Sequence, residues 1–300
     1  MEKKYDTIII GGGPAGMTAA IYAARYKLNA LVLAESYGGT ANEAHWVENW
    51  PGEPSITGNE LMKKFQQHVE SFDVESKLGR VVNIEKDGLF KVQTEREIFH
   101  AESIILTLGT QRRKLGVKGE EEFLGKGVSY CAHCDAFFYK NKKVAVVGGN
   151  DSAAQAALVL AQHAEKVYIL YRGEELRCEP LWKEKIEEKK NIEVLNNTTV
   201  EEIQGENAVT SVKLNNGELE TNGVFIEIGA VPNNELAKPL GIELSDDEHI
   251  KVNTQQETNV PGVFAAGDMT KGSIDFKQII VASAHGATAA FSAFKYLKRR

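Results

Sequence analysis

One stretch near the N-terminus restricts the possible folds of this chain more than any other. Residues 5–10, YDTIII, form an apolar, β-branched run that ends directly in GGGPAG at residues 11–16. A helical pattern follows, with Met17 and Ile21 on one face, and ALVLAE at residues 30–35 is typical of a second buried strand. Strand, glycine turn, helix, strand and terminal acid, in this order, predict a βαβ unit that binds a dinucleotide.

Each glycine of this turn has its own role in such a unit. Gly11 permits the tight turn, Gly13 lets a pyrophosphate approach the backbone, and Gly16 lets the helix pack closely on the strand. The N–H groups that start the helix then face the phosphates. Glu35 stands about 20 residues beyond the turn, where a carboxylate accepts hydrogen bonds from a ribose diol. The expected ligand is therefore FAD or NAD.

The same unit recurs at residues 142–172, KKVAVVGGNDSAAQAALVLAQHAEKVYILYR. Arg172 ends its second strand, and an arginine there suits a 2′-phosphate and so favours NADP; a solvated charge at a strand end is the other interpretation. Asn150 replaces a glycine, so its side chain must turn aside or intrude on the pyrophosphate, although asparagine tolerates positive φ. The corresponding residues are Gly11 and Gly148, Gly13 and Asn150, Gly16 and Ala153, and Glu35 and Arg172.

Composition narrows the class of protein. Three hundred residues with 42% hydrophobic content can bury a large core and suggest two domains. The net charge is −7 with acids and bases interspersed, so nucleic-acid binding is not expected. No stretch is long and apolar enough to span a bilayer, so no membrane association is expected either. Three cysteines are too few for a disulfide scaffold and suit a reducing compartment, which predicts a cytoplasmic protein.

Two of the three cysteines, Cys131 and Cys134, stand in SYCAHCD at residues 129–135. A structural zinc site needs four ligands and usually a second pair, which the chain lacks, so no metal is expected. A static disulfide across two residues closes almost no loop, and a reducing cytosol would open it. Reversible thiol–disulfide exchange remains. His133 lies between the cysteines, where it either favours a thiolate when protonated or points to solvent.

With these units in place, the chain resembles the low-molecular-weight thioredoxin reductases over residues 5–298. That resemblance implies an α/β protein of two doubly wound Rossmann-like nucleotide-binding domains. The FAD domain would be discontinuous, with residues 1–115 and 244–300, and an inserted NAD(P)-type domain of residues 116–243 would carry the cysteines. The motifs are GGGPAG, VENWPG (47–52), TLGTQRRKLGVKGE (107–120), CAHCD (131–135), GGNDSA (148–153), VPGVFAAGD (260–268) and KQIIVASAHGATAA (277–290).

The resemblance also implies which residues hold the cofactors. Asn49 would approach the flavin ring and Asp268 would bind the ribityl chain, although Asp268 alone also suits a turn or a helix cap. The implied FAD residues are Gly11, Gly13, Pro14, Ala15, Gly16, Glu35, Asn49, Thr107, Gly109, Gly267, Asp268, Lys277 and Gln278. Lys277 stands where the family usually has arginine. The implied nicotinamide-nucleotide residues are Gly148, Asn150, Asp151, Ser152, Arg172 and Arg177.

In the resembling family the two cysteines have different roles. Cys134 would face the flavin, Cys131 would attack the partner's disulfide, and Asp135 would protonate the departing thiolate. Burial beside thiols can raise a carboxyl pKa, which suits that role, and Asp135 could also cap a helix. The following residues, Phe137 to Tyr139, are expected in the core.

The resemblance therefore predicts a thioredoxin-disulfide reductase that acts as a homodimer, with thioredoxin or a similar dithiol protein as its partner. NADPH is the preferred donor, although YRGEELR at residues 171–177 contains one arginine fewer than NADPH-dependent relatives carry. NADH, ferredoxin or another donor is the alternative. A different class, an FAD-binding redox sensor that signals through its disulfide without turnover, also accommodates the same residues.

Overall fold

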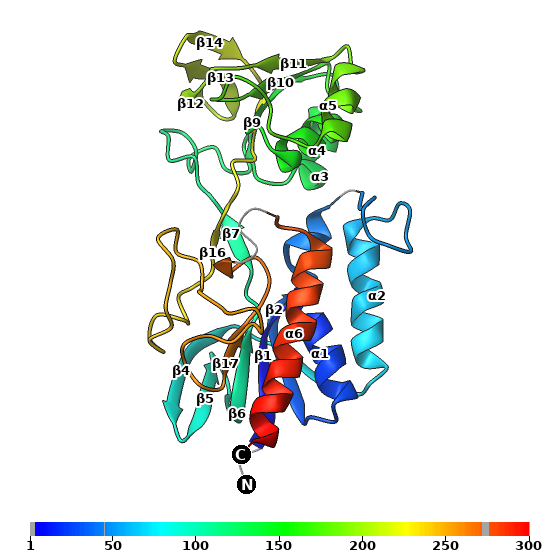
Figure 1. Ribbon diagram of the computed structural model, residues 1–300. Coiled ribbons are helices and arrows are strands. Elements are labelled where there is room, and N and C mark those ends of the chain that lie inside the picture. Colours follow the sequence, from blue (N-terminus) through cyan, green and yellow to red (C-terminus); the bar gives the residue numbers. More distant parts are fainter. Residues whose placement is uncertain (1–3, 45, 272–275, 300) are drawn as a thin grey trace. The chain divides into compact units, whose positions relative to one another are not determined.

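The structure is a computed structural model that describes residues 4–44, 46–271 and 276–299. The chain forms two compact units (Figure 1): unit 1 comprises Met1–Gln111 and Val231–Arg300, and unit 2 comprises Arg112–Ala230. The chain passes between them in β7 (Thr110–Arg112) and β16 (Ala230–Pro232), which pair as a two-stranded sheet. The discontinuous arrangement inferred from the sequence is therefore present.

The limits of the two units differ from the expected ones, which lay near Gly116 and Leu244. The second division falls at residue 231 because the following segment packs in unit 1. Ala237 and Ile242 are 1% and 5% exposed, and they belong to a core cluster that contains residues of β1 and β6. Removal of these apolar side chains from water ties the segment to unit 1.

Unit 1 is built on a seven-stranded sheet with β1 in a central position. β1 pairs in parallel with β2 and β6, and its central run Ile8, Ile9 and Ile10 is apolar and buried because both faces of the strand are covered there. The strands, in sheet order, are β3 (Glu75–Leu78), β2 (Ala30–Tyr37), β1 (Lys4–Gly12), β6 (Ile98–Leu106), β5 (Leu89–Thr94) and β4 (Val81–Asp87), with β17 (Val263–Ala265) parallel to the end of β6.

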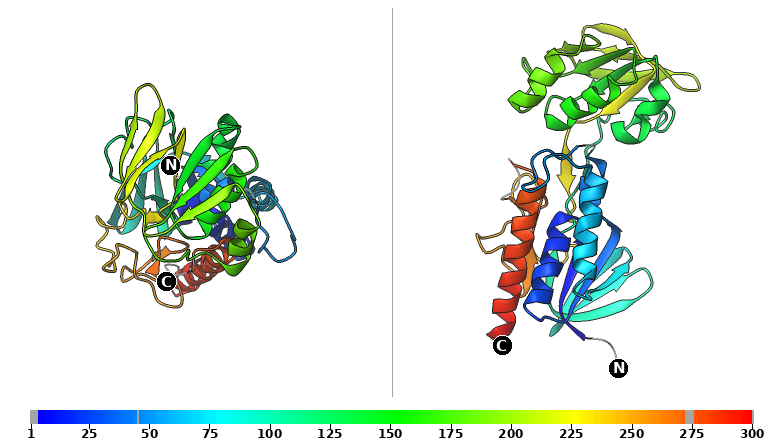
Figure 2. Two further views of the ribbon diagram at one scale, coloured as in Figure 1. Left: turned by 90° about the horizontal axis from the view of Figure 1, so that it is seen from above. Right: turned by 90° about the vertical axis from the view of Figure 1, so that its right-hand side faces the viewer.

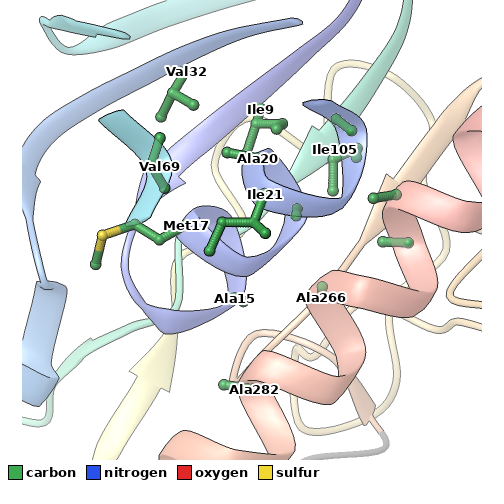
Figure 3. Close-up of a cluster of buried hydrophobic side chains, with 14 of the residues drawn as sticks. Ile9, Ala15, Met17, Ala20, Ile21, Val32, Val69, Ile105, Ala266 and Ala282 are labelled. Atoms are coloured by element: carbon green, nitrogen blue, oxygen red, sulfur yellow. The ribbon is translucent and has the colours of Figure 1, made fainter. Parts of the chain in front are cut away.

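Three helices of unit 1 lie side by side (Figure 2): α1 (Pro14–Arg25), α2 (Gly58–Glu70) and α6 (Ile279–Lys298), with η1 (Gly39–Glu43) before α2. Figure 3 shows Met17 and Ile21 among the buried side chains of this layer. The backbones of α1 and α6 approach closely, since a Cβ on Gly286 would lie 2.0 Å from the Ala15 carbonyl oxygen. The α2 helix begins at Thr57, which forms a capping box with Glu60.

Unit 2 contains a five-stranded parallel sheet and a separate antiparallel one. The parallel strands, in sheet order, are β11 (Ile192–Leu195), β10 (Lys166–Leu170), β9 (Lys143–Val147), β15 (Gly223–Ile226) and β8 (Val128–Ser129). The helices are α3 (Ala132–Asp135), η2 (Ala136–Tyr139), α4 (Asp151–Leu160) and α5 (Pro180–Glu187). The antiparallel strands are β12 (Val200–Gly205), β13 (Val209–Leu214) and β14 (Gly217–Glu220).

The predicted pair of Rossmann-like units is confirmed, and each also carries antiparallel strands. Within the described ranges, no helix has the length and apolar character needed to cross a membrane.

Candidate functional site

The first glycine turn leaves open space at the start of α1. Gly11 has φ +120°, and a Cβ there would lie 2.3 Å from the Thr107 carbonyl oxygen. A Cβ on Gly16 would lie 1.9 Å from the Gly11 oxygen, so only glycine allows the helix to sit this close. Gly13 differs, because a Cβ there would meet nothing within 4 Å. It is the N-cap of α1 and has no side-chain cap, so the first N–H groups of the helix are available to a phosphate.

Thr107 holds this turn from the neighbouring strand. Its backbone N–H and its hydroxyl both donate to the Ile10 oxygen, at 2.8 and 2.9 Å. Gly109, two residues on, has φ +62°, a conformation that favours glycine. Glu35 lies exposed near the end of β2, with its Oε1 3.5 Å from the Arg80 Nε. Its carboxylate is therefore accessible to a ribose diol at the carboxyl end of the sheet.

Asp268 lies three residues after the end of β17, next to Gly267, which contacts the start of α1. Gly267 has φ +81°, and a Cβ there would be 3.1 Å from the Ala15 Cβ at the start of α1. Burial raises the pKa of the Asp268 carboxyl, and the charge of Lys277 opposes that rise. A carboxylate in such surroundings is stabilised by any hydroxyl that donates to it. The burial of Asp268 therefore suits a carboxylate that binds the hydroxyl groups of a ligand better than one that belongs to a solvent-exposed turn.

Two further implied FAD residues meet through their side chains. Asn49 Nδ2 donates to Gln278 Oε1 at 2.9 Å, which joins the segment after η1 to the N-cap of α6. This bond and the close contacts of Gly267 and Gly286 with Ala15 bring several of the implied FAD residues to the start of α1 and of α6. Glu35 lies near the end of β2, the strand that pairs with β1. The cradle at Gly13 and the buried carboxylate at Asp268 fit FAD.

The second turn has the same backbone as the first. Gly148 has φ +147°, and Asn150 has φ −99° and ψ −176°, close to the −79° and −173° of Gly13. Tolerance of positive φ is therefore irrelevant at Asn150, which corrects that part of the sequence argument. Asn150 is exposed and makes no side-chain cap bond with α4, so the second turn carries an uncapped polar side chain where the first has only glycine.

The loop after β10 folds back onto this second turn. The Arg177 N–H donates to the Gly149 oxygen at 2.7 Å, and the Glu179 N–H donates to Asp151 Oδ1 at 2.7 Å. These bonds place Arg177 beside the glycine turn, while Arg172 lies exposed just after β10. Ser152 is exposed on the first turn of α4. The implied nicotinamide-nucleotide residues are thus gathered at the carboxyl end of one sheet.

Cys131 and Cys134 form a disulfide, as the spacing allows. Cys134 is exposed and Cys131 is half-buried. The Cys131 Sγ accepts the Cys134 N–H at 3.2 Å, and the Cys131 N–H donates to Ser129 Oγ at 2.9 Å. Asp135 is half-buried and makes no side-chain capping bond to the η2 turn that it precedes, so capping does not account for it. The side chain of His133 lies outside the described residues.

Three other features complete the surroundings. Phe137 and Phe138 are 72% and 68% exposed, so the expectation that they lie in the core is wrong; only Tyr139 is buried. Their place two and three residues after Asp135 is the signal that could have identified them as surface aromatics.

Cys178 is a free, half-buried thiol whose pKa burial raises. In the part of the chain that the structure describes, no group of three or more His, Cys, Asp or Glu could hold a metal ion.

Comparison with known proteins identifies the family. Residues 5–287 match the model of the pyridine nucleotide-disulphide oxidoreductases. The chain belongs to this family. It is 38% identical to a thioredoxin reductase of Bacillus subtilis (strain 168) over 306 residues, which covers 99% of this chain and 96% of that protein. The sequence-based assignment to an oxidoreductase of this kind is confirmed.

Solved structures agree with that assignment. The thioredoxin reductase of Lactococcus lactis superimposes with a TM-score of 0.95 at 37% identity and covers 99% of this chain and 100% of that one. A ferredoxin-flavin thioredoxin reductase from Clostridium acetobutylicum gives 0.56 at 34% identity, with 100% of both chains covered. The chain is thus similar both to proteins named thioredoxin reductase and to one named ferredoxin-flavin thioredoxin reductase.

Gly13→Asn tests the first cradle by copying the residue of the second. The backbone at Gly13 is already extended, so we expect the apoprotein to keep its melting temperature. Since the asparagine side chain enters the open space, FAD affinity should fall at least about tenfold, the equivalent of one lost phosphate contact. Flavin absorbance and fluorescence titration measure this. Unchanged FAD affinity in a folded variant would show that the cofactor does not use this turn.

Proposed function

We propose that this chain is a thioredoxin-disulfide reductase that uses NADPH, FAD and the Cys131–Cys134 pair. The observation that carries the proposal is the Cys131–Cys134 disulfide, partly exposed, in a unit whose fold is that of a nucleotide-binding domain. Bound FAD would supply two-electron transfer between the nicotinamide and the disulfide. The residues of unit 1 that fit it are those at the first glycine turn, Asn49, Asp268 and the segment 277–278.

The cysteines perform the exchange with the partner. In the dithiol state, the Cys131 thiolate attacks one sulfur of the thioredoxin disulfide, which forms a mixed disulfide and releases the other sulfur as a thiolate. Cys134 then attacks the Cys131 Sγ, which restores the internal disulfide and releases the second thioredoxin thiol. In this proposal Asp135, next to Cys134 in the chain, donates the proton that a departing thiolate needs. Two electrons leave the pair and two protons accompany the reduced partner.

Two observations support these roles. The Cys134 N–H points at the Cys131 Sγ, and such a hydrogen bond stabilises a thiolate, which favours Cys131 as the attacking thiol. Phe137 and Phe138 present an apolar surface a few residues from the disulfide. Exposed aromatic side chains of this size are typical of sites that another protein covers, and here they would contact the apolar rim of a small dithiol protein.

Cys131→Ser and Cys134→Ser should each retain FAD and lose thioredoxin reduction by at least about a hundredfold, because neither variant can complete the exchange. Cys178→Ser is the matched control. Its thiol is half-buried with a raised pKa, so that variant should keep wild-type activity. Steady-state turnover with thioredoxin measures the effect and also separates an enzyme from a redox sensor. Full activity in either of the first two variants would remove the dithiol mechanism.

NADPH is the proposed donor because two arginines lie at the second turn. Arg172 follows β10, and Arg177 is tied by its N–H to Gly149, so both can reach a 2′-phosphate. Asn150 favours the second candidate, a donor other than a nicotinamide, since its uncapped side chain stands where a glycine would admit the pyrophosphate. The similarity to a protein named as a ferredoxin-flavin thioredoxin reductase is consistent with that candidate.

Anaerobic addition of NADPH and then NADH to the FAD-loaded protein distinguishes the donors. Rapid loss of flavin absorbance with NADPH is expected. Arg172→Ala should slow it about tenfold or more while leaving the slower NADH reaction unchanged, because only NADPH carries the extra phosphate. Asn150→Gly should accelerate both. Stable absorbance with both nucleotides, together with its loss on addition of reduced ferredoxin, would replace NADPH by the second candidate.

We further propose that the protein is a cytoplasmic homodimer. Unit 1 exposes an aromatic face on α1 and α6, where the Tyr26 ring stacks on Phe294 at 4.7 Å and contacts Phe291 at 5.9 Å. Tyr22 and Phe291 remain partly exposed on this face. A second copy can cover such a surface with the same surface, as in a twofold dimer. An exchangeable disulfide and few cysteines suit a reducing compartment.

Sedimentation equilibrium should give twice the 33.0 kDa of one chain. Phe291→Arg places two like charges in the twofold interface and should shift the protein towards the monomer at micromolar concentration. Leu124→Arg, at an exposed apolar position in unit 2, is the control and should leave the dimer intact. A wild-type chain that sediments as a monomer would contradict the dimer.

A further inference from the structure

Glu120 is a buried carboxylate that the exchange reaction does not use. Only 3% of the residue is exposed. Its Oε1 accepts the Leu115 N–H at 2.7 Å and the Tyr130 hydroxyl at 2.5 Å, and its Oε2 accepts the Gly116 N–H at 2.6 Å. A carboxylate removed from water requires donors of this kind, so the three bonds hold it in a single position.

The turn that carries Glu120 is itself firmly held. Gly119 has φ +89°, and a Cβ there would lie 2.0 Å from the Ile203 carbonyl oxygen. The Ile203 N–H donates to the Lys118 oxygen at 2.9 Å. These contacts join the turn to β12 at a distance that no side chain would allow. Glu120 is therefore fixed to the antiparallel sheet of unit 2.

Tyr130 connects Glu120 to the redox pair, because Tyr130 immediately precedes Cys131 in the chain and donates its hydroxyl to Glu120. Burial raises the pKa of the Tyr130 hydroxyl, and the hydrogen bond to Glu120 raises it further, so the phenol stays protonated and acts as the donor. Ser129, the residue before Tyr130, is buried in β8, and its Oγ accepts the Cys131 N–H. Residues 129–131 are thus held at two points: Ser129 lies in β8, and Tyr130 is hydrogen-bonded to the Glu120 carboxylate.

We propose that Glu120 and Tyr130 are positioning residues for Cys131. Their hydrogen bond keeps the Cys131 backbone where the Sγ accepts the Cys134 N–H at 3.2 Å. That N–H stabilises the thiolate, so a looser segment disfavours the attacking form. The inference rests on the proposed thioredoxin reductase function, in which Cys131 is the attacking thiol.

Tyr130→Phe removes the hydroxyl and keeps the ring. The measurement is the pH dependence of iodoacetamide alkylation of Cys131 in the reduced, FAD-loaded protein, followed by mass spectrometry of the peptide that contains it. We expect the midpoint to rise by about half a pH unit or more, and the kcat for thioredoxin to fall about threefold to tenfold with unchanged KM, as for one lost charge-assisted hydrogen bond. Glu120→Gln should act in the same direction. The double variant should be no worse than Tyr130→Phe, since both act through one bond.

Two matched variants control for the loss of a phenol or of a charge. Tyr168→Phe changes a half-buried tyrosine on β10, and Glu121→Gln changes the exposed neighbour that pairs with Lys114. Both should keep the wild-type alkylation midpoint and kcat. Flavin absorbance and melting temperature establish that each variant is folded.

Glu120→Asp is the second test, because it keeps the charge and shortens the reach to Tyr130. Its midpoint should rise as in Tyr130→Phe. An unchanged midpoint and kcat in either folded variant would overturn the positioning role. If the wild-type chain does not reduce thioredoxin, the proposed function fails, whereas the alkylation midpoints still report whether Tyr130 positions Cys131.

Discussion

The close contact between α1 and β1 is the constraint on which the rest of unit 1 depends. The missing Cβ of Gly16 brings the first turn of the helix against the Gly11 carbonyl, at a distance that alanine would forbid. With the helix seated there, its unpaired N–H groups open at the carboxyl end of the sheet. Ala15 then receives Gly286 from α6 on one side and Gly267 on the other. These close contacts between small residues bring Asp268 and the N-cap of α6 to the end of the sheet where α1 begins.

Unit 2 repeats this architecture with a different ligand-facing surface. The turn at Gly148 reproduces the backbone of the first. What differs is the side chain at the N-cap of the helix, where Asn150 replaces Gly13, and the charge at the end of the second strand, where Arg172 replaces Glu35. Backbone geometry at the two turns is therefore shared, and the proposed difference in nucleotide preference rests on single side chains.

Sequence reasoning was most successful where chemistry is local. Both βαβ units follow from patterns of about thirty residues, and the disulfide follows from a spacing of three. It was least successful where a residue's surroundings come from distant segments. Phe137 and Phe138 are expected in the core, yet they are exposed, and nothing in the sequence analysis points to Glu120, which is buried. Residues 231–243 contain none of the motifs, and the packing of Ala237 and Ile242 with residues of β1 and β6 assigns this stretch to unit 1.

The amino-acid sequence alone is sufficient for the two Rossmann-like units, the redox pair and the family, because glycine positions and strand–helix periodicity act over short distances. The three-dimensional arrangement adds what short patterns do not contain. It shows that Asn49 reaches Gln278 across 229 positions, that Arg177 returns to Gly149, and that Glu120 holds Tyr130. Each of these bonds joins segments whose encounter depends on burial of the apolar faces between them, and no pattern within either segment encodes it.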